Sequence, residues 1–332
     1  TSRILPGCFF TRFSQTHGYG LNTRQVSLKM KTEIKNLKEK MKMKNVKKII
    51  GGALAAATLV LALSACGTAA NTQTTQSASS SAPAALSGTV ATNGSTSMEK
   101  VIGGLKEQFM ADNSGVTVSY DATGSGTGIE SVSNGTCDIG LSSRALKDEE
   151  TAKGLVGTTI ALDGIAIIVN ADSKVSDLSV DQIAQIFTGK ITDWSKVGGA
   201  AGAIACIGRE SGSGTRDGFE SITKTKDSCK LSQELTSTGA VIEAVKNGPN
   251  AVGYASLSAV EGQSGIKVLT VSGVACTEAA VLDGSYVIQR PFLLVTNSAK
   301  TLSPAAQAFF DYAVSKDAAA IITSAGAVPV AK

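Results

Sequence analysis

Three short segments of the sequence combine glycine with hydroxyl side chains. They span residues 93–97 (NGSTS), 123–128 (TGSGTG) and 209–216 (RESGSGTR). Glycine lets a backbone approach a ligand closely, hydroxyls donate hydrogen bonds, and a helix that begins there adds unpaired N–H groups at its positive end. Arg209 strengthens the third segment, because a planar guanidinium can pair with a tetrahedral anion through two bonds. Together the segments predict a site for an oxyanion.

A structural interpretation of these segments competes with this prediction. Clusters of glycine, serine and threonine also turn the chain and cap helices without any ligand, and an isolated arginine is often a surface residue. The occurrence of three such segments, one with an arginine, favours binding. A nucleotide site is excluded, because the chain has no GxxxxGK[ST] loop and Gly124, Gly126 and Gly128 lack the spacing of a dinucleotide fingerprint.

Catalytic and metal-binding residue types are scarce in the sequence. The one histidine is His17, so no Ser-His-Asp or Cys-His arrangement and no histidine metal site can form in the rest of the chain. The six cysteines include no CxxC pair. We therefore expect no enzyme, no metal and no cofactor. A phosphatase or serine hydrolase that uses Ser125 or Ser213 as nucleophile is the alternative, and it lacks a base.

Charge divides the chain into two unequal parts. The net charge is +4, but residues 1–65 carry 12 Lys and Arg and only Glu33 and Glu39, whereas the remainder holds 19 basic and 25 acidic residues. The acidic body gives no support to nucleic-acid binding. Any anion that it binds must be held by local dipoles and donors.

The basic N-terminal part has the features of an export signal. Five lysines at positions 40–48 precede an uncharged run at 49–65 that ends in Leu-Ser-Ala before Cys66. This ending resembles the bacterial lipobox, which implies that Cys66 carries lipid. A permanent membrane helix is the weaker alternative, because 17 apolar residues barely span a bilayer. Residues 66–87, rich in Ser, Thr and Ala, form a flexible tether.

From residue 88 onward, short strands and helices are predicted to alternate. The expected strands are 89–91, 116–120, 160–169, 203–207 and 292–295, and the expected helices are 97–110, 126–133, 180–187, 215–223, 239–246 and 304–314. Alternation of this kind predicts α/β layers with mainly parallel sheets. Each of the three glycine and hydroxyl segments follows a strand and opens a helix.

Several segments, in order, resemble a known family. They are the three segments above together with residues 137–144 (CDIGLSSR), 248–254 (GPNAVGY) and 286–291 (YVIQRP). They are similar to the phosphate-binding proteins of Pst-type ABC transporters. The resemblance implies a type II periplasmic-binding-protein fold, with two α/β lobes joined by two crossing strands and a ligand cleft between them. Lobe one would comprise 88–166 and 287–332, and lobe two 167–286, after a leader and signal peptide at 1–65.

The resemblance also implies the ligand, the partners and the site residues. The ligand is inorganic phosphate, delivered to the permease and ATPase subunits of an ABC importer by a monomer held at the outer face of the cell membrane. The expected phosphate-binding residues are Ser95, Thr96, Ser125, Ser143, Arg209, Ser213, Gly214 and Thr215.

One position departs from the family pattern. Where the family has an aspartate that accepts the proton of bound phosphate, this chain has Ser143, followed by Arg144. A serine does not repel fully ionised sulfate as a carboxylate does, so selectivity over sulfate, molybdate or a phosphonate stays open. Arg144 is expected to add charge. A surface lipoprotein without a ligand is a further alternative.

Four cysteines of the body leave their pairing open. Disulfides between Cys206 and Cys229 and between Cys137 and Cys276 are compatible with an oxidising exterior, and four free thiols are the alternative.

Overall fold

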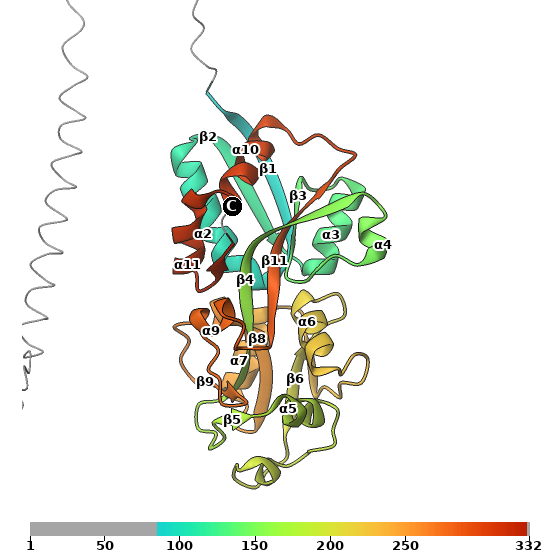
Figure 1. Cartoon of the computed structure of the whole chain (residues 1–332), viewed down its shortest axis with the longest axis vertical. Coiled ribbons are helices and arrows are strands. Elements are labelled where there is room, and N and C mark those ends of the chain that lie inside the picture. The colour runs from blue at the N-terminus through green and yellow to red at the C-terminus, as the bar shows by residue number, and fades with distance from the viewer. Residues whose placement is uncertain (1–84, 331–332) are drawn as a thin grey trace, which may run out of the picture. The chain divides into compact units, whose positions relative to one another are not determined.

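A computed structural model describes residues 85–330, and within them the chain forms two α/β lobes joined by two strands (Figure 1). The signal peptide predicted at 1–65, the lipid site at Cys66 and most of the tether at 66–87 lie outside the described residues. Between residues 85 and 330, no helix combines the length and the apolar character needed to cross a bilayer.

Lobe one is a small sheet covered by helices. Its strands are β1 (Ser87–Gly94), β2 (Gly115–Ala122) and β3 (Ile139–Ser142), and β1 lies between the other two and pairs with both in parallel. Its helices are η1 (Thr96–Met98), α2 (Glu99–Asp112), α3 (Ser125–Asn134), α4 (Asp148–Thr151), α10 (Pro304–Ala313), η3 (Lys316–Ala318) and α11 (Ala319–Ser324). Buried side chains of β1, β2, α2 and α10, among them Val90, Leu105 and Phe309, form its core.

Lobe two repeats the plan around a second set of parallel strands. Strand β6 (Ala205–Arg209) pairs with β7 (Gln233–Leu235) and β8 (Ala251–Ser256). The other elements are β5 (Asp177–Leu178), α5 (Val180–Phe187), η2 (Trp194–Val197), α6 (Gly214–Thr223), α7 (Thr238–Asn247), α8 (Leu257–Val260), β9 (Ile266–Val268), β10 (Thr270–Val271) and α9 (Glu278–Leu282). Phe187, Phe219 and Tyr254 pack in its core, and the rings of the last two stack at 4.2 Å.

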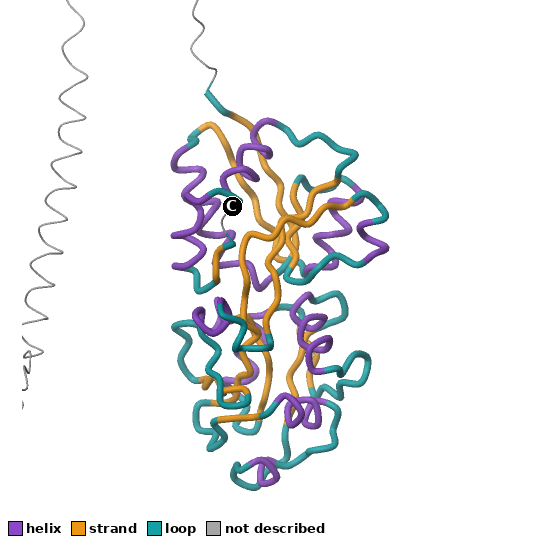
Figure 2. The backbone as a smooth tube through the Cα atoms, viewed as in Figure 1, coloured by secondary structure: helices purple, strands orange, loops and turns teal. Residues whose placement is uncertain are grey.

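Two antiparallel strands connect the lobes. Strand β4 (Leu155–Asn170) pairs with β11 (Gln289–Asn297) and β12 (Val328–Pro329) in lobe one and with β8 and β9 in lobe two. Figure 2 shows these strands running from one lobe into the other. Within residues 85–330 the backbone passes between the lobes through β4 and at β11, which makes this pair the natural hinge.

The crossing strands also change the sheet from the predicted one. All five predicted strands and six predicted helices form, with boundaries that differ by a few residues, but the sheet is mixed and not mainly parallel. The parallel pairs lie within each lobe, whereas β4 and β11 run antiparallel to their neighbours, because one strand leaves lobe one and the other returns. The strand predictions omitted the shorter strands, and two of these, β3 and β8, connect the parallel strands of each lobe to β11 and β4.

The cysteines in the described part of the chain are all free. Cys206 and Cys276 are buried, and Cys137 and Cys229 are half-buried. Neither of the two disulfides considered from the sequence is formed.

Candidate oxyanion-binding site

Four helix N-termini, two from each lobe, surround one cluster of hydroxyl groups. In lobe one, η1 begins after Ser95 and α3 begins after Gly124. In lobe two, α6 and α7 begin after Ser213 and Ser237, whose hydroxyls accept hydrogen bonds from N–H groups of the first turn at 3.3 and 3.1 Å. Helix N-termini carry unpaired N–H groups and partial positive charge, so their convergence favours a negatively charged ligand.

The lobe-one side of the cluster consists of three serines. The Ser95 hydroxyl donates to Ser143 Oγ at 2.8 Å, and the Ser143 and Ser125 hydroxyls lie 3.2 Å apart. The Ser143 N–H donates to Ser125 Oγ at 3.0 Å. All three side chains are at most 2% exposed. Buried hydroxyls require partners, and here they find them in one another.

Hydroxyl groups also join the two lobes. Thr96 Oγ1 lies 2.9 Å from Thr238 Oγ1, and Ser97 Oγ lies 2.8 Å from Thr215 Oγ1 and 3.1 Å from Thr238 Oγ1. The first residue of each pair comes from lobe one and the second from lobe two. The structure is therefore a closed form, in which groups from both halves meet without water between them.

Arg209 brings a guanidinium to the lobe-two side of this cluster. Its Nη1 donates to Thr238 Oγ1 at 3.1 Å, and its side chain is buried. Nε and Nη2 donate to the Glu210 carboxylate at 2.9 and 2.7 Å, which neutralises the charge and orients the fork. Since the arginine is already paired, attraction for an anion must come largely from the hydroxyl and N–H donors around it.

Glycines allow the two lobes to approach this closely. A Cβ on Gly214 would lie 2.4 Å from Ser125 Oγ and 2.6 Å from Ser143 Oγ, so the start of α6 fits against the serines only as glycine. The N–H of Gly126 donates to the carbonyl of Gly212 at 2.9 Å, a backbone bond from lobe one to lobe two. The glycines of the second and third segments therefore serve close packing across the cleft.

The predicted binding residues lie together in space. Ser95, Thr96, Ser125, Ser143, Arg209, Ser213, Gly214 and Thr215 are all buried at the junction of the lobes. Ser213 differs from the prediction in one respect, because its hydroxyl caps α6 through the Arg216 N–H. Arg144 is also placed differently from expectation. Its guanidinium binds Glu150 at 2.7 Å and Asp217 at 2.9 Å, so it bridges the lobes and adds no free charge to the hydroxyl cluster.

Three residues of the cluster were not among those expected from the sequence, and one of them, Ser97, lies within the first of the three segments. Thr238 is the hub that joins Thr96, Ser97 and Arg209. The segment 236–239 (TSTG) has the same composition as the three segments above and also opens a helix, so the same rule would have found it. The third residue is Arg290, which reaches the cluster from β11. It lies in the segment 286–291 that resembles the family, but no glycine or hydroxyl pattern there indicated a role in binding.

Arg290 forms an ion pair with Asp163 at the hinge. Nη2 and Nε lie 3.0 and 3.2 Å from Asp163 Oδ2, and both side chains are almost fully buried. Burial raises the pKa of Asp163, while Arg290 and the Ser256 hydroxyl, which donates to Oδ1 at 2.6 Å, oppose that shift. The remaining nitrogen, Nη1, donates to Ser143 Oγ at 3.2 Å. The hinge strands are thus connected directly to the hydroxyl cluster.

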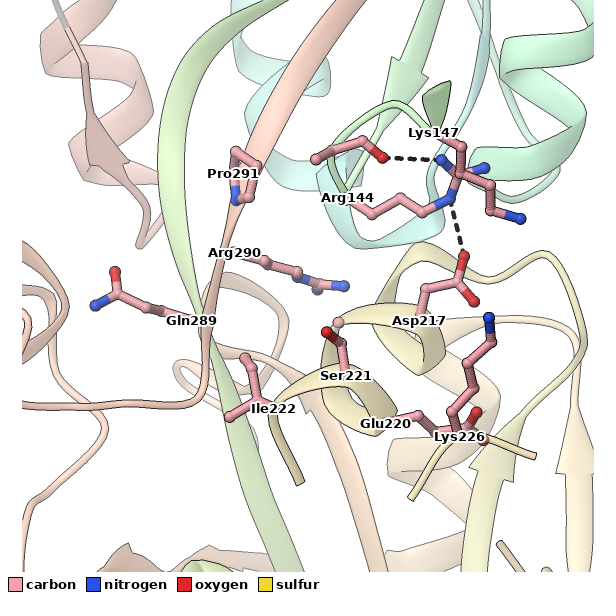
Figure 3. A pocket seen from close by; sticks show the side chains of 12 residues that line it. Arg144, Lys147, Asp217, Glu220, Ser221, Ile222, Lys226, Gln289, Arg290 and Pro291 are labelled. Carbon is pink, nitrogen blue, oxygen red and sulfur yellow. Dashed lines mark hydrogen bonds and ion pairs between the residues drawn. The ribbon is translucent and has the colours of Figure 1, made fainter. Parts of the chain in front are cut away.

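A cavity of about 390 Å³ lies beside the hinge (Figure 3). Its lining includes Arg144, Asp217, Lys226, Gln289 and Arg290. Figure 3 shows Arg144 and Asp217 facing each other across it, joined by their ion pair. The cavity therefore separates the two lobes next to the buried cluster, and one ion pair spans it.

Comparisons with known proteins agree with this architecture. Residues 79–317 match the PBP superfamily domain. The phosphate-binding protein PstS of Bacillus subtilis (strain 168) is 32% identical over 279 residues, which are 82% of this chain and 91% of the relative. PstS of Borreliella burgdorferi is 28% identical over 71% of this chain and 88% of its own length.

Solved structures show the same fold. A phosphate ABC transporter substrate-binding protein of Clostridium perfringens with bound phosphate is 35% identical, with a TM-score of 0.70 over 73% of this chain and 100% of that one. An ABC-type phosphate transport receptor of Vibrio cholerae is 29% identical, with a TM-score of 0.61 over 72% and 99% of the two chains. These likenesses confirm the expected two-lobed binding-protein fold. The chain belongs to the PBP superfamily and, within it, to the PstS family of phosphate-binding proteins.

Proposed function

We propose that this protein binds inorganic phosphate outside the cell and delivers it to an ABC importer. The observation that carries the proposal is the convergence of hydroxyls, glycine backbone and four helix N-termini from two lobes on one buried cluster beside Arg209. Such a donor-rich enclosure matches an anion with four oxygens. The names of the relatives, which are phosphate-binding and phosphate-transport proteins and not enzymes, support the same function.

The ligand enters by opening of the lobes about β4 and β11. The site residues are buried in the closed form, so an anion reaches them only when the inter-lobe bonds of Thr96, Ser97 and Gly126 are broken. When the lobes close again around the anion, the groups that were bonded to each other across the cleft donate to the anion instead. Each such charge-assisted bond contributes about 1.5–3 kcal/mol, so several together give tight binding and stabilise the closed form.

The proposed binding residues are those expected from the sequence, with Thr238 added. Arg209 offers Nη1 as a charged donor, since its other donors are paired with Glu210. Thr215 and Gly214 supply a hydroxyl and backbone at the start of α6, which Ser213 caps. On the lobe-one side Thr96 and Ser125 supply hydroxyl donors, and Ser95 and Ser143 hold Ser125 through the hydrogen bonds among the three serines. The lobe boundaries at 166/167 and 286/287 are proposed as hinge points; they lie in or next to the crossing strands.

The location of the protein is proposed from the sequence. Residues 1–65 act as leader and signal peptide, Cys66 carries lipid, and 66–87 tether a monomeric binding protein to the outer face of the cell membrane. Cys66→Ala is expected to leave the protein unlipidated and to release it from the membrane fraction, which immunoblotting of membrane and medium measures. Retention of the Cys66→Ala protein on the membrane contradicts the anchor without affecting the proposed ligand.

Isothermal titration with phosphate tests the function directly. Saturable binding of one phosphate per chain is expected, and Arg209→Ala is expected to weaken it by at least about tenfold, since a buried charged donor is lost. Lys300→Ala, which removes an exposed positive charge, is the matched control and is expected to bind normally. Absence of phosphate binding refutes the proposal. Preferential binding of sulfate or molybdate would show that the ligand is an oxyanion other than phosphate.

A further inference from the structure

A chain of hydrogen bonds leads from the hinge ion pair into the binding cluster. Asp163 occupies Nε and Nη2 of Arg290, which leaves Nη1 to donate to Ser143 Oγ at 3.2 Å. A guanidinium has five N–H donors and no acceptor. The direction of the bond from Arg290 to Ser143 is therefore fixed.

The Ser143 hydroxyl can donate its proton in only one direction. A serine oxygen has two acceptor positions. Arg290 uses one of them, and the Ser95 hydroxyl, which donates at 2.8 Å, uses the other. The Ser143 hydroxyl must consequently donate, and Ser125 Oγ lies 3.2 Å away to receive the proton.

The same count applies to Ser125. Its oxygen accepts the Ser143 N–H at 3.0 Å and, from the step above, the Ser143 hydroxyl. Both acceptor positions are then filled, so the Ser125 proton must point away from Ser143. The start of α6 lies on that side, as shown by the 2.4 Å between Ser125 Oγ and the place where Gly214 would carry a Cβ. The chain of bonds ends in a donor at the junction of the lobes.

We propose that Arg290 is a specificity-determining positioning residue. It orients the hydroxyls of Ser143 and Ser125 so that Ser125 can only donate a hydrogen bond to the ligand. This inference rests on the proposed function. Held by Asp163, Arg290 prevents Ser143 and Ser125 from accepting a proton from the ligand. The ligand oxygen that faces these serines is therefore unprotonated. The serine side of the site accommodates fully ionised sulfate as readily as phosphate. Discrimination between the two anions is correspondingly weak.

The first test changes the polarity of the chain without adding charge. In the double variant Asp163→Asn/Arg290→Gln, the buried pair stays neutral overall, and glutamine can accept as well as donate. Ser143 is then free to accept the Ser125 proton, and Ser125 can accept the proton of phosphate. Titration of the purified full-length chain with sulfate and phosphate near neutral pH is expected to show the ratio of the sulfate Kd to the phosphate Kd rise by about tenfold. A purely structural role of the pair would weaken both anions alike and leave the ratio unchanged.

A second pair of variants leaves the hinge ion pair intact. It provides a test even if the double variant does not fold. Ser143→Asp introduces an acceptor, and it is expected to weaken sulfate at least about tenfold more than phosphate, because a carboxylate repels an anion that has no proton to donate. Ser143→Ala is the matched control, which removes the hydroxyl without adding charge and is expected to weaken both anions by similar factors.

The outcomes separate this inference from the proposed function. Failure of the unaltered protein to bind phosphate refutes the function. Phosphate binding together with rejection of sulfate by about tenfold or more overturns the inference alone. It is also overturned by a sulfate-to-phosphate ratio that stays constant in the double variant, or, where that variant does not fold, by one that stays constant in Ser143→Asp.

Discussion

Thr238 offers the sharpest test of the site, because one hydroxyl joins both lobes and the arginine. Its Oγ1 lies 2.9 Å from the Thr96 hydroxyl, 3.1 Å from the Ser97 hydroxyl and 3.1 Å from Arg209 Nη1. Valine has the same shape and lacks the hydroxyl. Thr238→Val therefore removes the hub without opening a cavity.

The size of the effect follows from burial. Thr238 is 2% exposed, so water cannot replace the lost partner of Arg209. A buried donor left without a partner costs about 1–3 kcal/mol, which corresponds to a loss of affinity between about fivefold and 150-fold. The loss falls on the closed form, where the three groups meet, and so it is expected in phosphate binding more than in folding.

Titration calorimetry with phosphate measures this loss, and a neighbouring residue supplies the control. Ser237 caps the same helix by accepting the Ala240 N–H at 3.1 Å. Ser237→Ala is expected to lower the stability of the protein by about 1 kcal/mol, seen as a lower Tm, with phosphate affinity nearly retained. The two variants separate the stability of α7 from its contact with the cluster.

The reasoning is refuted if Thr238→Val binds phosphate within about twofold of the unaltered protein. It is also refuted if Ser237→Ala loses as much affinity as Thr238→Val, because helix stability and not the shared hydroxyl would then control binding.

Three further predictions concern other parts of the molecule. Asp217→Asn weakens the inter-lobe ion pair with Arg144 at 2.9 Å, and because Asp217 is partly exposed, we expect phosphate release in stopped-flow experiments to be only about two- to fivefold faster; an unchanged rate contradicts this. Gly128→Ala would place a Cβ 2.4 Å from a backbone oxygen of β1 and is expected to cost about 1–3 kcal/mol in denaturant unfolding, whereas Gly103→Ala, where a Cβ meets nothing within 4 Å, should not destabilise; equal effects would contradict the packing argument. Burial raises the pKa of Cys206 from 9.0 to about 12, so its thiolate is scarce at pH 8. The reaction of Cys206 with Ellman's reagent should therefore be much slower in the folded protein than in urea. Equal rates would show that the thiol is accessible.

Local chemistry made most of the site recognisable in the sequence. Glycine and hydroxyl residues next to each other, after a strand and before a helix, determine where N–H donors and small polar side chains can point. This rule located the three segments that contain Thr96, Ser125 and Thr215, and the family resemblance singled out those residues within them. It depends on neighbours in the chain, so it needs no knowledge of the tertiary fold. The same rule, applied to residues 236–239, would have identified Thr238.

Contacts between distant segments lay beyond that rule. Asp163 and Arg290 meet because β4 and β11 run antiparallel with Asp163 opposite Arg290, and Ser143 reaches them only because β3 pairs with β11. No local pattern encodes a register between strands more than 100 residues apart. Arg144 shows the same limit, since a basic residue beside the site was expected to add charge and instead pairs with Glu150 and Asp217.

The chain's own residues thus specify which chemistry is available, namely small donors and glycine at helix starts, and they exclude a histidine-based enzyme from the body. The path of the two crossing strands and the closure of the lobes specify which donors share one enclosure and in which direction their protons point. The physical reason is that propensity and capping act over a few residues, whereas the polarity of a buried hydrogen-bond chain depends on every group that packs against it.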